Sequence, residues 1–323
     1  MKKILSILLI LALFCGCASK QEEVVDEDVD LSSTKILCPA GAPALAFYNE
    51  AGNENFVTGD ASSILPELKG SGDVDIIVID TVNGIKALNA GANYKLAATL
   101  TFGNFYIVST GHDDDGVMDA DDYIVVFSQG ATPDLVFHYL YGDQYDVGIH
   151  YVQAVSDAST CAIKGINITD DSHSADEDPY VDYVMIAEPA LSAAMSKNEN
   201  LSVYANVQDL YAEKSNGLSM IQASVFVSNN YAYGKEFLTQ LESDINEVLA
   251  NPELFSNAIS DAGLGDDEFK DLFGVANANL ATKVLTSNSI GLGFKMAYDN
   301  KEAIDNFVSL FDLGTTSEEI YFQ

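Results

Sequence analysis

The groups best suited to chemistry follow apolar stretches, at points where a strand leads into a helix. In Val125–Leu140 (VVFSQGATPDLVFHYL), Gly130 occupies the turn between an apolar run and an amphipathic run. We expect Thr132 to cap a helix that starts at Pro133, with Asp134 in its first turn. Such a turn directs free N–H groups towards a polar or anionic ligand. An ordinary strand–helix connection has the same sequence pattern.

The same pattern of strand, turn of small residues and helix occurs three more times. The strands are Ile36–Cys38, Asp75–Ile79 and Val181–Ile186, and the turns that follow them are residues 39–44, 80–83 and 187–190. In α/β sheets, ligands bind off the carboxyl ends of the strands. Four such turns with few charges therefore predict one ligand site.

Two carboxylates, Asp80 and Glu188, stand at the ends of predicted strands and directly before predicted helices. Each can accept hydrogen bonds from an amine or amide of a ligand. Each can equally cap the helix that follows it. The sequence leaves both roles open.

Motifs of known catalytic chemistry are missing. The chain has no G-x-S-x-G, no H-E-x-x-H, no Walker loop and no G-x-G-x-x-G after a strand. Its histidines His112, His138, His150 and His173 are scattered, and each is expected to be packed or solvated. The acidic loop 112–122 does not fit the register of a calcium loop, so a solvated surface loop is expected. The sequence predicts no catalytic residue, no metal site and no cofactor.

The charge of the chain restricts its partners. The formal net charge is −34, and all 15 basic residues are Lys. Nucleic acid is excluded as a partner, because its recognition needs a basic surface. Without Arg, a bidentate clamp on a carboxylate, sulfonate or phosphate is also missing. An anionic ligand would depend on helix N-termini, hydroxyls or Lys.

The N-terminus predicts export. Lys2 and Lys3 precede an apolar run, Ile4–Phe14, that is too short to span a membrane. The following Cys-Gly-Cys resembles a bacterial lipoprotein processing box, so residues 1–16 would be a signal peptide and Cys17 the lipidated first residue. An ordinary signal peptide cleaved elsewhere is the alternative. Residues 17–34 are acidic and polar, which is typical of a disordered tether.

The two cysteines of the body, Cys38 and Cys161, lie far apart in the sequence. Exported proteins often pair their cysteines, but these two are predicted to belong to different domains. We expect two separate thiols.

The order of elements predicts two domains. Strands and helices alternate from Lys35 onwards, and then two strands, Tyr94–Leu100 and Thr101–Val108, follow each other directly. There the chain can pass from one domain to the other. After the strand Ser224–Ser228 we expect only helices, which fits a first domain that receives back its own C-terminal helices.

Several segments resemble ABC-importer solute-binding lipoproteins, in the subgroup that contains nitrate, alkanesulfonate and thiamine-precursor binding proteins. The resemblance covers nearly the whole chain from Lys35. Its segments are Pro39–Ala44, Gly72–Val78, Ser128–Asp134, Ala187–Ala190 and Glu318–Phe322.

That resemblance implies a two-lobed periplasmic-binding-protein type II α/β fold, each lobe a mixed sheet flanked by helices, with the ligand cleft between the lobes. Lobe 1 would comprise 35–103 and 223–323, and lobe 2 would comprise 104–222, with one hinge near Gly103 and Asn104. The implied ligand-binding residues are Ala42, Pro43, Asp80, Thr81, Asn83, Asn104, Gln129, Gly130, Ala131, Thr132 and Glu188.

The implied function is capture of a small organic solute by lobe closure and its delivery to an ABC permease and, through it, an ATPase. The protein would be a non-enzymatic monomer, held outside the cytoplasm by its lipid anchor. Because Arg is absent and two carboxylates are predicted near the cleft, we favour a thiamine-precursor-like pyrimidine over a sulfonate or nitrate. A surface enzyme and a sensory or adhesive lipoprotein on the same fold are the alternatives.

Overall fold

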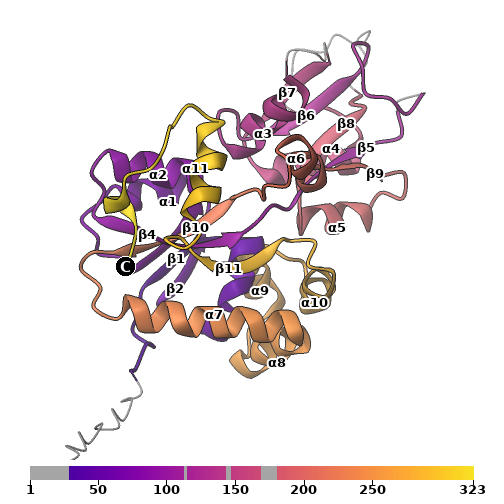
Figure 1. Cartoon of the computed structure of the whole chain (residues 1–323). Coiled ribbons are helices and arrows are strands. Elements are labelled where there is room, and N and C mark those ends of the chain that lie inside the picture. The colour runs from indigo at the N-terminus through magenta and orange to yellow at the C-terminus, as the bar shows by residue number, and fades with distance from the viewer. Residues whose placement is uncertain (1–28, 113–114, 143–146, 169–179) are drawn as a thin grey trace, which may run out of the picture. The chain divides into compact units, whose positions relative to one another are not determined.

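The computed structural model describes residues 29–112, 115–142, 147–168 and 180–323. The predicted signal peptide, Cys17, most of the tether, His173 and part of the acidic loop 112–122 lie outside these ranges. By its contacts the chain divides at Asp30, and Leu31–Gln323 forms the second unit. All helices and strands described below belong to the second unit (Figure 1). Within the described ranges, no helix combines the length and apolarity needed to cross a membrane.

The first sheet contains six strands in the order β11-β4-β10-β3-β1-β2. They are β1 (Ile36–Pro39), β2 (Phe56–Gly59), β3 (Ile76–Asp80), β4 (Tyr94–Thr101), β10 (Ala223–Ser228) and β11 (Leu292–Met296). β1, β2 and β3 run parallel, and β10 runs antiparallel to both β3 and β4. The carboxyl ends of β1 to β4 therefore share one edge of the sheet.

The second sheet contains five strands in the order β7-β6-β8-β5-β9. They are β5 (Phe105–Ser109), β6 (Tyr123–Phe127), β7 (Gly148–Val152), β8 (Tyr183–Ala187) and β9 (Ser202–Asn206). β6, β7 and β8 are parallel, whereas β5 is antiparallel to its neighbours β8 and β9. The carboxyl ends of β6 to β9 share one edge here too. The predicted α/β class with two mixed sheets is confirmed.

Helices cover both sheets because the strands carry apolar side chains on both faces. In β3, Ile76 and Val78 belong to the core cluster with the 3₁₀ segment η1 and α7, while Ile77 and Ile79 belong to the cluster with α1 and α2. The helical segments are η1 (Ala42–Glu50), α1 (Ala61–Leu68), α2 (Thr81–Asn89), α3 (Thr132–Tyr141), α4 (Val155–Lys164), α5 (Ala190–Met195), α6 (Val207–Lys214), α7 (Gly234–Ala250), α8 (Glu253–Ala262), α9 (Asp266–Phe273), α10 (Ala278–Ser287), α11 (Lys301–Ser309) and η3 (Glu318–Ile320).

Two expectations about strands are wrong. The chain after Ser228 is not entirely helical, because β11 pairs antiparallel with β4 at the edge of the first sheet. Its sequence, LGFKM, contains a glycine and a lysine and has no clear alternation, so pairing rather than local pattern makes it a strand. The second strand of the crossing begins at Phe105 and not at Thr101, which ends β4.

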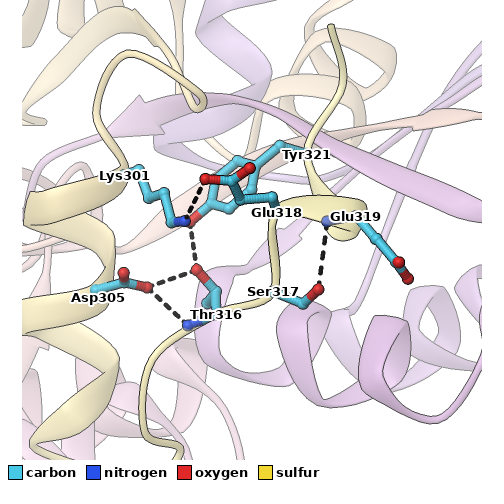
Figure 2. A network of polar contacts seen from close by, with 7 residues as sticks. All are labelled: Lys301, Asp305, Thr316, Ser317, Glu318, Glu319 and Tyr321. Atoms are coloured by element: carbon cyan, nitrogen blue, oxygen red, sulfur yellow. Dashed lines mark hydrogen bonds and ion pairs between the residues drawn. The ribbon is translucent and has the colours of Figure 1, made fainter.

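The C-terminal residues add to the first sheet. Tyr321 lies beside Leu96 of β4, and the Phe322 N–H donates to the Leu96 carbonyl at 2.9 Å. Figure 2 shows how polar contacts hold this segment: the Thr316 hydroxyl lies 2.6 Å from the Tyr321 hydroxyl, and the Thr316 N–H donates to Asp305 at 2.8 Å. Burial raises the pKa of Tyr321 to about 12.

An aromatic contact connects helices that flank different sheets. The ring centroid of Tyr211 in α6 lies 5.5 Å from that of Tyr139 in α3 and 5.8 Å from that of Phe307 in α11. Helices α3 and α6 contact strands of the second sheet, whereas α11 follows β11 of the first. One core cluster therefore includes residues of both sheets.

Gly84 in α2 lies directly above Phe226 of β10. A Cβ at this position would lie 2.0 Å from Cζ of the Phe226 ring. We expect Gly84→Ala to reduce the free energy of unfolding by about 1–3 kcal/mol, because the ring has to move within a packed core. Urea unfolding measures this change.

Phe226→Ala supplies the control background. Without the ring, Gly84→Ala should be neutral or stabilising, since alanine is the better helix former. An equal loss in both backgrounds would show that the ring is not the cause.

Candidate functional site

The carboxyl edges of the two sheets are joined by the chain itself. At the edge of the first sheet, Ala223 of β10 pairs with both Asp80 of β3 and Thr101 of β4. Phe102, Gly103 and Asn104 then lead into β5, whose first residue, Phe105, pairs with Ala187 at the end of β8. The strand ends of both sheets, where the predicted site residues lie, are therefore only a short crossing segment apart.

Asp80 connects the two edges. Its Oδ1 accepts a hydrogen bond from the Asn83 N–H at 2.9 Å, so it caps α2. Its Oδ2 accepts a hydrogen bond from the hydroxyl of Thr132 in α3. Loss of solvation raises the pKa of the half-buried Asp80 carboxyl above its ordinary value, and these hydrogen bonds oppose that rise.

Glu188 makes the reciprocal arrangement from the second sheet. Its Oε2 accepts from the Ser192 N–H at 3.0 Å, so it supports the start of α5, and its Oε1 accepts from the Ser192 hydroxyl at 2.8 Å. The hydroxyl of Ser289, in the turn after α10, also donates to Oε1 at a long 3.4 Å. Asp80 is thus the N-cap of α2, whereas Glu188 precedes the N-cap Pro189 and accepts from the third N–H of α5. Each carboxylate also accepts a hydroxyl from the other sheet's side of the molecule.

Thr132 does not cap α3 as expected. Ala131 is the N-cap residue, Thr132 is the first residue of the helix, and its side chain is 1% exposed. The hydroxyl turns to Asp80 because a carboxylate is a stronger acceptor than the alternative backbone groups. Thr81, 0% exposed, is likewise occupied, since its hydroxyl lies 2.7 Å from that of Ser224.

Two N–H groups of the turn before α3, where the sequence suggested free donors, bond within the protein. The Gly130 N–H donates to Oδ2 of Asp134 at 2.8 Å, and the Ala131 N–H donates to the Ser128 carbonyl at 2.9 Å. Asp134 is buried, and its Oδ1 accepts from the Tyr151 hydroxyl at 2.8 Å. The protein's own carboxylate therefore occupies the place at this helix start that an anionic ligand would take.

The remaining predicted residues are less tightly grouped. Ala42 is buried at the start of η1, where the preceding Gly41 N–H donates to the Phe273 carbonyl at 3.0 Å. Pro43, Asn83 and Ala131 are half-buried, and Gln129 and Gly130 are exposed. The structure brings Asp80, Asn83 and Thr132 together, and it separately brings Asn104 to Glu188.

Two hollows in the described part of the chain lie away from these residues. One, of about 350 Å³ and open, is lined by Lys95 and C-terminal residues such as Tyr321. Another, of about 40 Å³, lies between η1 and α7. Neither is lined by a predicted ligand residue. At Asp80 and Glu188 the two strand edges are in contact through hydrogen bonds from Thr132 and Ser289.

Sequence reasoning missed Ser192, Ser224 and Ser289, which all bond to predicted site residues. Only Ser192 had a local signal, because it is the third helical residue after a carboxylate and can therefore take part in a capping arrangement. Ser224 and Ser289 lie 143 and 101 residues from their partners in the chain. No local pattern predicts such contacts.

The two cysteines of the body are free thiols buried in different core clusters, in agreement with the expectation of separate thiols. Burial raises the pKa of both. Within the described ranges, no group of three or more His, Cys, Asp or Glu side chains could hold a metal ion.

Thr132→Val removes the hydroxyl that reaches Asp80 while keeping the shape of the side chain. We expect the free energy of unfolding to fall by about 1 kcal/mol, because the carboxylate loses a buried hydrogen-bond donor. Thr132→Ser keeps the hydroxyl and should lose less. Equal losses in chemical denaturation would show that methyl packing and not the hydrogen bond matters.

Asp80→Asn tests the raised pKa of this carboxyl. The native state holds the proton more tightly than the unfolded state, so stability falls as pH rises from about the ordinary pKa of 3.8 through the raised native value. Asparagine still caps a helix and lacks this pH dependence. The variant should therefore gain stability relative to the unmodified protein as pH rises, with the largest gain near pH 7. Thermal unfolding between pH 4 and 7 measures it, and a gain that grows on acidification contradicts the assignment.

Comparison with known proteins identifies the fold. No protein-family model and no curated protein matches the sequence. A structure of an ABC transporter protein from Parabacteroides distasonis is 18% identical, with a TM-score of 0.69 over 90% of this chain and 99% of that chain. The periplasmic aliphatic sulphonate binding protein SsuA from Escherichia coli is 13% identical, with a TM-score of 0.58 over 90% and 92%. A Candida albicans protein described as having the generic periplasmic binding protein fold is 14% identical, with a TM-score of 0.52 over 89% and 92%. The chain therefore has a fold of the periplasmic-binding-protein type.

Proposed function

We propose that this chain is the extracytoplasmic solute-binding component of an ABC importer, which captures a small organic solute between two lobes and delivers it to a permease. The observation that carries the proposal is the pair of reciprocal contacts at the strand edges. Asp80 accepts from Thr132, and Glu188 accepts from Ser289. Each pair joins one sheet's carboxyl edge to a hydroxyl on the other side, as closure over a ligand requires.

The lobes of this proposal are residues 35–103 with 223–323, and residues 104–222. The structure supports them in that the strands of each sheet fall within one of these sets. Hinged closure needs few chain crossings, and the crossing at Gly103 has a conformation suited to a bend, with φ of 108°. A Cβ there would also lie 2.5 Å from the side chain of Gln208.

Closure without a ligand has to be reversible. The hydrogen bonds of Asp80 and Glu188 across the edges are weak enough to allow this. Hydrogen bonds between lobes exchange with water at a small net free-energy change, about 1 kcal/mol each. A solute shifts the population only through its differential affinity for the closed state. Two contacts of this strength permit a solute of ordinary affinity to control closure.

We infer that the solute is a thiamine-precursor-like pyrimidine rather than a sulfonate or nitrate. Asp80, Asp134 and Glu188 give the edges a negative character, and the helix start nearest to them is already occupied by Asp134. An anionic solute would meet these carboxylates without an Arg to offset them. SsuA is named for sulphonate binding and has a similar fold. We nevertheless infer a different solute for this chain.

The partners follow from the same role. The importer permease would receive the solute, and an ATPase would act through the permease. Lipid at Cys17 would hold the monomeric protein at the outer face of the membrane. Proteins of similar fold include a ligand-binding component of an ABC-type import system from Staphylococcus aureus, 8% identical.

A thermal-shift screen tests the proposal. We expect 4-amino-2,5-dimethylpyrimidine to raise the melting temperature by several degrees, since a ligand present at 100 times its Kd stabilises the folded state by about 2.7 kcal/mol. Ethanesulfonate and nitrate should raise it less. Small-angle scattering then measures compaction on binding. Stabilisation by the sulfonate alone reverses the solute preference, and turnover of a bound compound would favour an enzyme.

A further inference from the structure

Asn104, at the end of the crossing between the sheets, has an acceptor with no partner. Its side chain is 3% exposed, and its Oδ1 is fully buried without a hydrogen bond to any described residue. From this we infer that Asn104 Oδ1 recognises the solute, and that the solute must present an N–H donor to it. This inference rests on the proposed function and assigns the specificity of that site to one atom.

The orientation of the amide is fixed by its neighbour. Asn104 Nδ2 donates to the Glu188 carbonyl at 2.6 Å, and the Glu188 N–H donates back to the Asn104 carbonyl at 2.9 Å. Exchanging the amide oxygen and nitrogen would place two acceptors against each other at that distance. The unpartnered atom is therefore the oxygen, and the site lacks a donor.

Leaving such an atom unpaired is costly. A buried acceptor without a donor loses its hydrogen bonds to water and gains none within the protein, which costs about 1–3 kcal/mol. Gln222, whose N–H and carbonyl bond to Thr101 and Thr81 at the edge of the first sheet, has a buried Oε1 in the same condition. The unsatisfied Asn104 Oδ1 is an atom that a donor-bearing group arriving from outside the chain would pair with.

Several protein donors at the strand edges are engaged in other hydrogen bonds. The hydroxyl of Thr132 bonds to Asp80, and the hydroxyl and N–H of Ser192 bond to Glu188. Tyr106 lies two residues after Asn104 in the sequence, and its hydroxyl donates to the Ser289 carbonyl at 3.2 Å. An acceptor-only solute such as a sulfonate or nitrate finds few donors here and leaves Asn104 Oδ1 unpaired. Solutes with an amino group, a ring N–H or an ammonium group satisfy it.

Matched solute pairs test the class of ligand. The first pair is 4-amino-2,5-dimethylpyrimidine and its 4-dimethylamino analogue, which lacks N–H. The second pair is butylammonium and butyltrimethylammonium, which share a charge and differ in N–H. Ethanesulfonate and nitrate are the acceptor-only arms. Calorimetry on the full chain should show at least tenfold tighter binding of the N–H member of whichever pair binds.

Two variants separate recognition from structure. Asn104→Asp keeps an acceptor at Oδ1 but turns its second oxygen towards the Glu188 carbonyl, which costs stability, whereas Asn104→Ala loses both groups. We expect both to lower the melting temperature of the ligand-free protein. Only Asn104→Ala should abolish the preference for the N–H solute, and Asn104→Asp should retain it. Asn198→Ala, which removes a side-chain amide that donates to the carbonyls of Ala162 and Ile163 in α4, is the matched control and should leave that preference unchanged.

The outcomes are distinct. Equal loss of solute preference in Asn104→Asp and Asn104→Ala assigns a structural role to the side chain and overturns the inference. Tight closure on ethanesulfonate or nitrate also overturns it, while the solute-binding function stands. If no solute in the panel binds or compacts the protein, the proposed function fails and the inference fails with it.

Discussion

The arrangement at the strand edges depends on carboxylates that each serve two partners. Asp80 holds the start of α2 with one oxygen and a hydroxyl from α3 with the other. Glu188 does the same for α5 and for the turn after α10. Because the capping bond fixes each carboxylate in place, the second oxygen is already oriented before the opposite side approaches. Contact between the two sides therefore requires little further ordering of side chains.

This use of carboxylates determines what the edges can bind. Helix starts, hydroxyls and turn N–H groups are the usual means of holding an anion. Here the N–H of Gly130 goes to Asp134, and the hydroxyls of Thr81 and Thr132 go to Ser224 and Asp80. These internal bonds engage three of the groups that could hold an anion, which is one ground for the solute proposed above. Similar proteins of this fold include a sulphonate-binding one, so the fold alone does not decide the ligand.

Much of the fold could be predicted from the sequence, because strand and helix periods and turn residues are local signals. The nearly continuous apolar run of β3 is one case, and the Thr132-Pro133 start of α3 is another. The partners of the site residues could not be predicted. Thr132 reaches an acceptor 52 residues away, and Ser289 one 101 residues away. β11 was missed for the same reason, since its pairing with β4 and not its composition makes it a strand.

The aromatic contact of Tyr211 with Tyr139 and Phe307 bears on how the proposed lobes would separate. Parting those rings would wet a large apolar area, and each ring buried in this way is worth about 2 kcal/mol. The polar bridges at Asp80 and Glu188 cost far less to break. If the proposed lobes separate, the hydrogen bonds at Asp80 and Glu188 would therefore break at a lower free-energy cost than the aromatic contact.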